Sequence, residues 1–215
     1  MLSSLRYTFK KDNERVSKMA ALSKAEMLEL ENIVSGLLKQ FGYDEKTDIS
    51  VDIARFAGEL GFRVGVATLP ENEDGLIVIR SHDLKRDDSL GDKVIAVNRD
   101  RSFLMKRFTV AYEFAYSVLN YEKTNYFSHH RLVSERANED PKVLYFVSAL
   151  LMPRKSFVKK VKDLKSIGIT GNALIFQLAS IFRVSETDVI DRIDCTFFLD
   201  GDLETAKALL ANDYL

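Results

Sequence analysis

The stretch RFTVAYEFAY, residues 107–116, decides how the rest of the chain is organised. Its apolar positions are so dense that we expect a helix over residues 103–119, buried on most of its sides. Tyr112 and Tyr116 are about one helical turn apart and therefore lie one above the other on the same face. Glu113 would cost roughly several kcal/mol if it were buried, ionised and unpaired. We therefore expect Glu113 to face a cavity, a partner group or water, or else to lie on a single polar stripe of the helix.

This spacing of three side chains is the spacing of a His-Glu-x-x-His helix in zinc peptidases. In that motif the two imidazoles hold the metal, and the glutamate polarises the water bound to it. Here tyrosine stands at both ligand positions, Tyr112 and Tyr116. Whether the chain is an enzyme depends on that difference.

Helices and strands are predicted before this central helix. Ser23 and Glu26 form a capping box, and apolar residues then recur at helical spacing as far as Gly42. A second, shorter helix is predicted from about residue 50 to Gly61. Strands are predicted over residues 62–66, 76–79 and 93–98. The order of two helices, a small antiparallel sheet and a long buried helix predicts an α+β fold.

A polar, loop-like segment over residues 120–136 follows, and it contains His129 and His130. Adjacent side chains do not converge on one face of a helix, nor do they share one side of a strand. We therefore favour an ordinary loop with pH-sensitive charge over a metal site formed by both histidines.

The C-terminal third of the chain is predicted to be mainly helical. An apolar helix runs from Pro141 to Pro153, where it must stop. A basic stretch around Lys159 then indicates an amphipathic surface helix with a solvated lysine face, or else a surface for an acidic or nucleic-acid partner. Late in the chain, residues 197–199 resemble a strand and residues 203–210 a closing helix.

Residues 174–193 have the outline of a helix-turn-helix, in which Ser185 caps the second helix. Arg183 stands at the turn position that glycine usually holds. The second helix is mostly acidic, so a DNA duplex would repel it. We therefore interpret these helices as packing elements rather than as a DNA-reading unit.

The composition excludes several classes of protein. The chain of 215 residues has a formal net charge of −1, so no global basic field attracts nucleic acid nonspecifically. The one cysteine, Cys195, cannot form an internal disulfide or a cysteine zinc cluster, and we expect it to be a reduced, packed thiol. No stretch approaches the roughly 20 apolar residues of a membrane span. We expect a cytoplasmic protein with no membrane association.

Four blocks in the same order carry a resemblance to a known family. They are residues 94–98, 107–111, 146–153 and 178–185. Together the blocks resemble the ImmA/IrrE family of zinc metallopeptidase-like proteins, which occur in mobile elements, phages and stress-response systems. The resemblance covers most of residues 25–195.

The resemblance implies a fold and a domain organisation. The fold is a zincin-like metallopeptidase scaffold with a small antiparallel sheet, a buried central helix and a helical C-terminal part. The expected domains are a polar lead-in over residues 1–20, a metallopeptidase-like domain over residues 21–165, and a C-terminal helical region over residues 166–215 packed on it.

Site residues follow from the resemblance position by position. The two histidine ligands of the family fall on Tyr112 and Tyr116, and its general base falls on Glu113. The third ligand, a glutamate in the family, falls near Asp140. Two neighbouring residues, Glu135 and Glu139, leave the register of that third position open.

Zinc is therefore expected in the family but not in this chain. A neutral imidazole binds zinc near pH 7, whereas a phenol must first lose a proton with a pKa of about 10. Without zinc there is no activated water for Glu113 to use. We expect the two tyrosines to fill the pocket, with hydroxyls that can hydrogen-bond to Glu113 or Asp140.

The leading functional hypothesis is a catalytically inactive, metallopeptidase-like protein that acts by binding another protein. The resemblance implies a partner such as a transcriptional repressor or another regulator of a mobile element or phage. The first alternative is an active endopeptidase that cleaves a regulator and holds its metal through His129, His130 and Glu113. The second alternative is a DNA-associated regulator that uses the basic stretch around Lys159 and the C-terminal helices.

Overall fold

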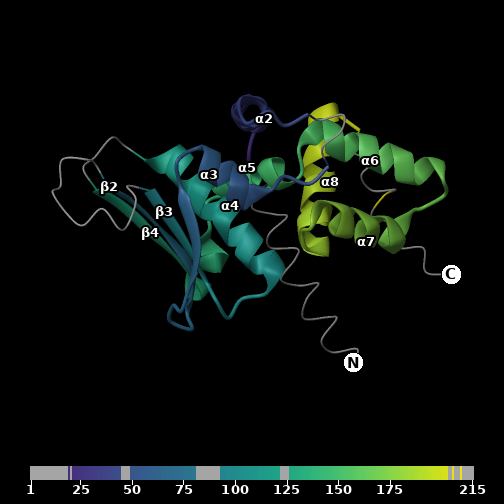
Figure 1. The fold of residues 1–215 in the computed structure, drawn as a ribbon. Helices are drawn as coiled ribbons and strands as arrows, with labels where there is room; N and C mark the ends of the chain where they lie inside the picture. The colour runs from purple at the N-terminus through teal and green to yellow at the C-terminus, as the bar shows by residue number, and fades with distance from the viewer. Residues whose placement is uncertain are drawn as a thin grey trace. The chain divides into compact units, whose positions relative to one another are not determined.

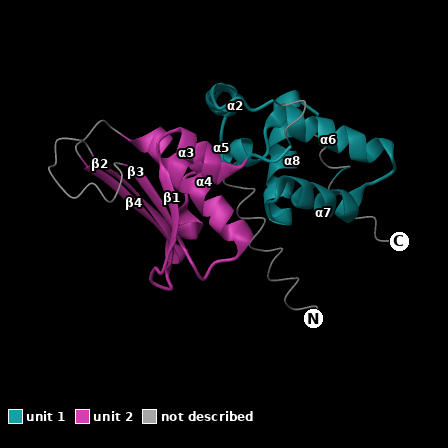
Figure 2. Cartoon of the chain, viewed as in Figure 1, with its two compact units in different colours: residues 1–51, 144–215 teal, residues 52–143 magenta. Residues whose placement is uncertain are grey.

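A computed structural model of the chain divides into two compact units (Figure 2). Unit 1 comprises residues 1–51 and 144–215, and unit 2 comprises residues 52–143. The residues that the structure describes are 19, 21–44, 49–80, 93–121, 126–202, 205 and 209. The expected lead-in and closing helix lie almost wholly outside these residues. The expected domain boundaries at residues 20 and 165 stay predictions.

Over its described residues, unit 2 contains a four-stranded sheet, the two α-helices α3 and α4, and a short 3₁₀ helix, η1 (Figure 1). Its elements are α3 (Ile53–Glu59), β1 (Arg63–Ala67), β2 (Glu73–Arg80), β3 (Lys93–Asn98), α4 (Phe103–Asn120), β4 (Tyr126–Leu132) and η1 (Val133–Asn138). The central helix predicted from residues 107–116 is α4, and it packs on β2 and β3.

The sheet is mixed, whereas the sequence predicted an antiparallel one. The strand order is β1-β3-β2-β4. β2 runs antiparallel to both β3 and β4, but β1 pairs with β3 in parallel. Alternation of apolar residues predicts strands without fixing their order. β3 lies between β1 and β2 in the sheet. Because β3 is antiparallel to β2 and parallel to β1, the sheet contains both kinds of pairing.

The sequence predicts a loop around the two histidines. In the structure this segment is instead the edge strand β4. It pairs with β2, and His129 lies opposite Ile77 while His130 lies opposite Leu76. The burial of β4 alternates between exposed and half-buried residues over its first five positions. An edge strand with one solvent-exposed face lacks the run of apolar residues by which a buried strand is identified.

The helix α4 is buried along most of its length. Its N-terminus is capped by Ser102, whose hydroxyl accepts the backbone N–H of Met105 at 3.3 Å. Residues 107–115 are all buried, a run of about two and a half turns. The expected burial is thus confirmed. The alternative in which Glu113 lies on a polar stripe is wrong, because this part of the helix has no exposed side.

One glycine sets how closely α4 approaches the sheet. A Cβ atom built on Gly75 of β2 would lie 2.5 Å from Thr109 Cγ2 of α4 and 2.7 Å from the Ala96 carbonyl oxygen. Both separations are far below any normal van der Waals contact. Only glycine at this position lets helix and sheet pack as they do.

Unit 1 is helical over its described residues. Its helices are α2 (Lys24–Gln40), α6 (Arg154–Ser166), α7 (Gly171–Phe182), α8 (Glu186–Asp200) and most of α5 (Pro141–Leu151), which begins in the last residues of unit 2. The capping boxes predicted at Ser23 and Ser185 are both present. No described helix is both long enough and apolar enough to cross a bilayer.

Two predictions for the C-terminal region have different outcomes. Residues 197–199 are not a strand but part of α8, which continues as far as Gly201, where φ is +74°. Cys195 is buried on the same helix, as expected of a packed thiol. Arg183, between α7 and α8, has φ +55°, so an arginine takes the left-handed conformation in which glycine is usual.

Candidate functional site

The two tyrosines of α4 line a pocket of about 280 Å³ in unit 2. Tyr112 is buried and Tyr116 half-buried. Their rings stack in near-parallel planes, with centroids 6.4 Å apart and an interplanar angle of 21°. The structure thus confirms that the two side chains lie one above the other on one helix face.

Glu113 is wholly buried and is paired with a histidine. A hydrogen bond of 2.7 Å joins Glu113 Oε2 to His129 Nδ1 on β4. Burial raises the pKa of the Glu113 carboxyl, and the hydrogen bond to His129 acts in the opposite direction. The other carboxylate oxygen, Oε1, is buried and has no hydrogen-bond partner among the described residues.

His129 also closes the side of the pocket next to the tyrosines. Its ring stacks on Tyr116 with centroids 3.7 Å apart, and its centroid lies 6.0 Å from that of Tyr112. No tyrosine hydroxyl bonds Glu113 within the described part of the chain, so that expectation is wrong. The alternative bond from a tyrosine hydroxyl to Asp140 stays a prediction. No local sequence pattern marks this pairing, because the polar segment around His129 predicts a loop rather than a strand.

His130 lies on the opposite side of β4, as the alternation of side chains along a strand requires. Its Nδ1 is 3.2 Å from Glu73 Oε1, in a more exposed pair. The structure therefore brings His129 to Glu113 but not His130. The rebuilt metal site in which all three side chains converge is not assembled.

Arg131, which follows the two histidines, lies beside Tyr112. Its guanidinium carbon is 5.0 Å from the centroid of the Tyr112 ring and 4.9 Å from that of Phe108. Two of its nitrogens, Nη2 and Nε, donate to Glu139 Oε1 at 2.6 and 2.9 Å. Only 5% of the Arg131 side chain is exposed. A buried cation is thus fixed against a ring that lines the pocket, and it is paired with a carboxylate that also lines it.

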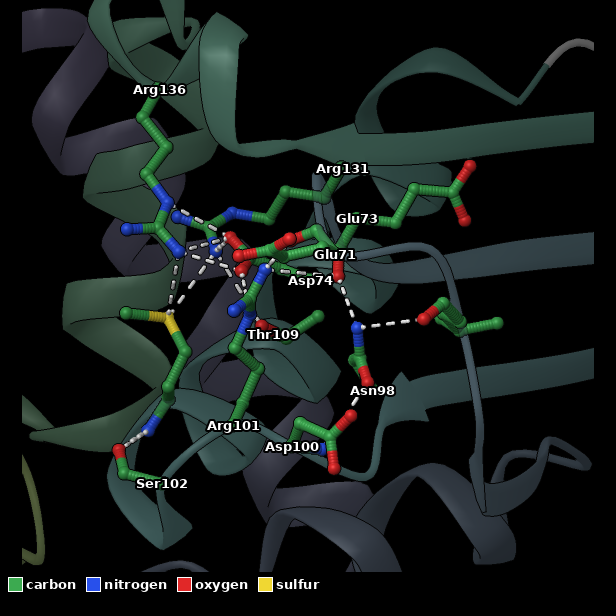
Figure 3. Close-up of polar contacts among 12 residues, drawn as sticks. Glu71, Glu73, Asp74, Asn98, Asp100, Arg101, Ser102, Thr109, Arg131 and Arg136 are labelled. Carbon is green, nitrogen blue, oxygen red and sulfur yellow. Dashed lines mark hydrogen bonds and ion pairs between the residues drawn. The ribbon is translucent and has the colours of Figure 1, made fainter.

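Asp74, at the centre of Figure 3, holds Arg131 from the other side. This aspartate is fully buried, and its Oδ2 accepts Arg131 Nη1 at 2.6 Å. It also accepts Arg101 Nε at 2.7 Å and Arg136 Nη2 at 2.6 Å. Three arginines from separate segments therefore converge on one carboxylate. The sequence alone does not reveal this cluster, because its members lie too far apart along the chain to form a local pattern.

All three candidates for the third ligand line the same pocket as the tyrosines. They are Glu135, Glu139 and Asp140. Glu139 is paired with Arg131, and Asp140 Oδ1 accepts the backbone N–H of Lys142 at 2.8 Å in the first turn of α5. The register of the third position stays open among them.

The side chains around this pocket do not fit a zinc ion. Burial, and next the negative charge of Glu139, raise the pKa of the Tyr112 phenol, so Tyr112 stays protonated and is a poor ligand. Arg131 puts a positive charge beside the same ring. Within the described part of the chain, no three histidine, cysteine, aspartate or glutamate side chains gather in a way that can hold a metal ion.

A comparison with protein families identifies more than half of the chain. The model of the family described as Peptidase_M78, IrrE N-terminal-like domain, matches residues 71–193. The match begins just before β2 and ends within α8, so it includes α4 and every residue of the pocket. No curated protein matches the chain.

Proposed function

The chain belongs to the Peptidase_M78 family, and from that premise we propose that it is a metal-free, catalytically inactive member that acts by binding another protein. The proposal rests on the side chains that bond two carboxylates, those of Glu113 and Glu139. Glu113, at the general-base position, is bonded to His129, and Glu139 is bonded to Arg131. Both carboxylates that a peptidase would use for its metal and its water are thus paired with side chains of this protein.

The chemistry of hydrolysis gives these pairings their meaning. A zinc peptidase needs a metal to lower the pKa of bound water to about 7, and a carboxylate free to take the proton from that water. In this chain Tyr112 holds its proton, and the carboxyl of Glu113 is buried and already bonded to His129. Both features favour a site without hydrolytic activity.

The position of β4 supports the binding part of the proposal. β4 is at the edge of the sheet, and among the described strands it pairs only with β2. An exposed strand edge binds an extended segment of another protein through backbone hydrogen bonds. His129 of this strand lines the pocket, so a segment added to β4 would run past the pocket. The partner that we propose is a regulator such as a transcriptional repressor of a mobile element or phage.

The test is to use the full chain as bait in an extract of the native host, with and without EDTA. Wild type and Glu113→Gln are expected to capture the same partner at equal yield, with the intact mass of the partner unchanged in every sample. A shortened, metal-dependent form of the partner with wild type, absent with Glu113→Gln, would contradict the proposal.

Two matched variants test whether β4 is the binding edge. Tyr126 of β4 and Val66 of β1 lie on the two opposite edge strands, and they are 53% and 56% exposed. Tyr126→Glu is expected to reduce capture of the partner, and Val66→Glu to leave it unchanged. Equal effects of the two variants would remove β4 from the proposal.

A further inference from the structure

We propose that Arg131 is a built-in cation that keeps divalent metals out of the pocket, so that restoring histidine at positions 112 and 116 does not by itself restore zinc binding. The inference rests on the proposed function and deepens it, since it assigns the exclusion of metal to one residue. The two tyrosines remove the ligands, and Arg131 removes the electrostatic attraction.

The positive charge of Arg131 lies beside one of the two former ligand positions. The guanidinium carbon of Arg131 lies 5.0 Å from the centroid of the Tyr112 ring, at one of the two former ligand positions. A divalent ion held by a side chain at position 112 would therefore lie close to a positive charge. Repulsion between like charges is strong at such a distance in a buried site, where water screens it poorly.

Arg131 is also bonded to a candidate third ligand, Glu139. Arg131 donates two hydrogen bonds to Glu139 Oε1, at 2.6 and 2.9 Å. The carboxylate charge of Glu139 is thereby compensated by an arginine that is always protonated. A metal would have to displace this charge-assisted pair before it could use Glu139.

Arg131 cannot swing away at little cost. Its Nη1 is bonded to the fully buried Asp74 at 2.6 Å, and its guanidinium packs on the ring of Phe108. The cation is therefore fixed from two sides. Arg101 and Arg136 also bond Asp74, so replacing Arg131 leaves that carboxylate paired. This redundancy makes the substitution of Arg131 a usable test.

The experiment compares zinc affinity, measured by competition with a chromophoric chelator at pH 7.5, in three variants of the full chain. The first is Tyr112→His/Tyr116→His. The second adds Arg131→Gln, and the third adds Arg136→Gln as the matched control. Arg136 bonds Asp74 and Met105 Sδ, as Arg131 does, but Arg131 lines the pocket and Arg136 is not among its lining residues. Thermal melting establishes that each variant is folded.

We expect the histidine pair alone to bind no stoichiometric zinc at micromolar concentration. Adding Arg131→Gln is expected to tighten zinc binding by at least about 10-fold, the scale on which groups around a ligand set change metal affinity. Adding Arg136→Gln should leave the affinity of the histidine pair unchanged. Stoichiometric zinc in the histidine pair alone, or equal tightening by both glutamine substitutions, would overturn the inference.

The same samples separate this inference from the proposed function. Wild-type protein that binds zinc would contradict the proposed function, whatever the variants do. If wild type binds none and the histidine pair binds zinc fully, only the role of Arg131 is wrong. Should the Arg131→Gln triple variant fail to fold, stoichiometric zinc in the histidine pair alone would still overturn the inference, because that variant keeps Arg131.

Discussion

Glu113 Oε2 and His129 Nδ1 are 2.7 Å apart, although one residue lies on the central helix and the other on the edge strand of the sheet. This bond joins α4 to β4 within unit 2. It also explains how a glutamate with no exposed surface is tolerated in the buried middle of this helix. The group that hydrogen-bonds this buried carboxyl is the imidazole of His129.

The first prediction concerns the pH dependence of stability at Glu113. Burial raises the pKa of this carboxyl from its ordinary value near 4.5. An acid whose pKa is raised by folding contributes stability that is present below the unfolded pKa and is lost as the pH rises through the folded pKa. The free energy of unfolding of wild type should therefore fall with pH relative to Glu113→Gln, by up to about 1.4 kcal/mol per pH unit in that window. Urea unfolding between pH 4.5 and pH 8 checks this, and a pH-independent difference would contradict it.

The second prediction concerns the close approach of α4 to the sheet. Gly75→Ala would place a methyl group 2.5 Å from Thr109 Cγ2 and 2.7 Å from a backbone oxygen, so we expect a loss of roughly 1–3 kcal/mol. Adding Thr109→Ser should recover only part of it, because the backbone contact remains. Gly36→Ala, in the middle of α2 with nothing within 4 Å, should instead stabilise by roughly 0.5–1 kcal/mol. Similar effects of the two alanines on the thermal midpoint would be the contrary result.

The third prediction concerns the buried ion pair of unit 1. Arg192 is fully buried, and its Nη1 lies 2.6 Å from Glu31 Oε1 while its Nε donates to the Met152 carbonyl at 2.9 Å. Arg192→Met leaves the half-buried carboxylate of Glu31 without its cation, at a cost of roughly 3–5 kcal/mol. Lys160→Met breaks a more exposed pair with Asp163 and should cost less than about 1 kcal/mol. Equal losses in denaturant unfolding would show that Arg192 is not a structural cation.

The fourth prediction concerns the reactivity of the one cysteine. Burial raises the pKa of the Cys195 thiol to about 12, so at pH 8 very little of it is thiolate. Native protein should therefore react with a disulfide reagent at least about 100-fold more slowly than protein unfolded in guanidinium, where one thiol per chain should react. Rapid labelling of the native protein would place Cys195 at the surface.

Sequence patterns predicted the features that depend on neighbours along the chain. The buried helix, the stacking of Tyr112 on Tyr116 and the two capping boxes all follow from spacings of three or four residues. The family follows from blocks of the same kind, and the family match confirms it.

Features that depend on long-range pairing were not predictable in this way. Asp74 and Arg131 are 57 residues apart, and nothing local marks them as partners. The strand that carries His129 is identified only by its pairing with β2. A short apolar run such as residues 197–199 fits either a strand or a helix. In the structure these residues continue the helix α8.

The most direct test of the account is the zinc content of the purified full chain. Protein expressed with added zinc, desalted and measured by inductively coupled plasma mass spectrometry, should hold far less than one zinc per chain. Tyr112→Phe should hold the same small amount, because the phenol is not a ligand. One zinc per chain in wild type, lost in Tyr112→Phe, would contradict the claim that protein groups replace the metal at Glu113 and Glu139.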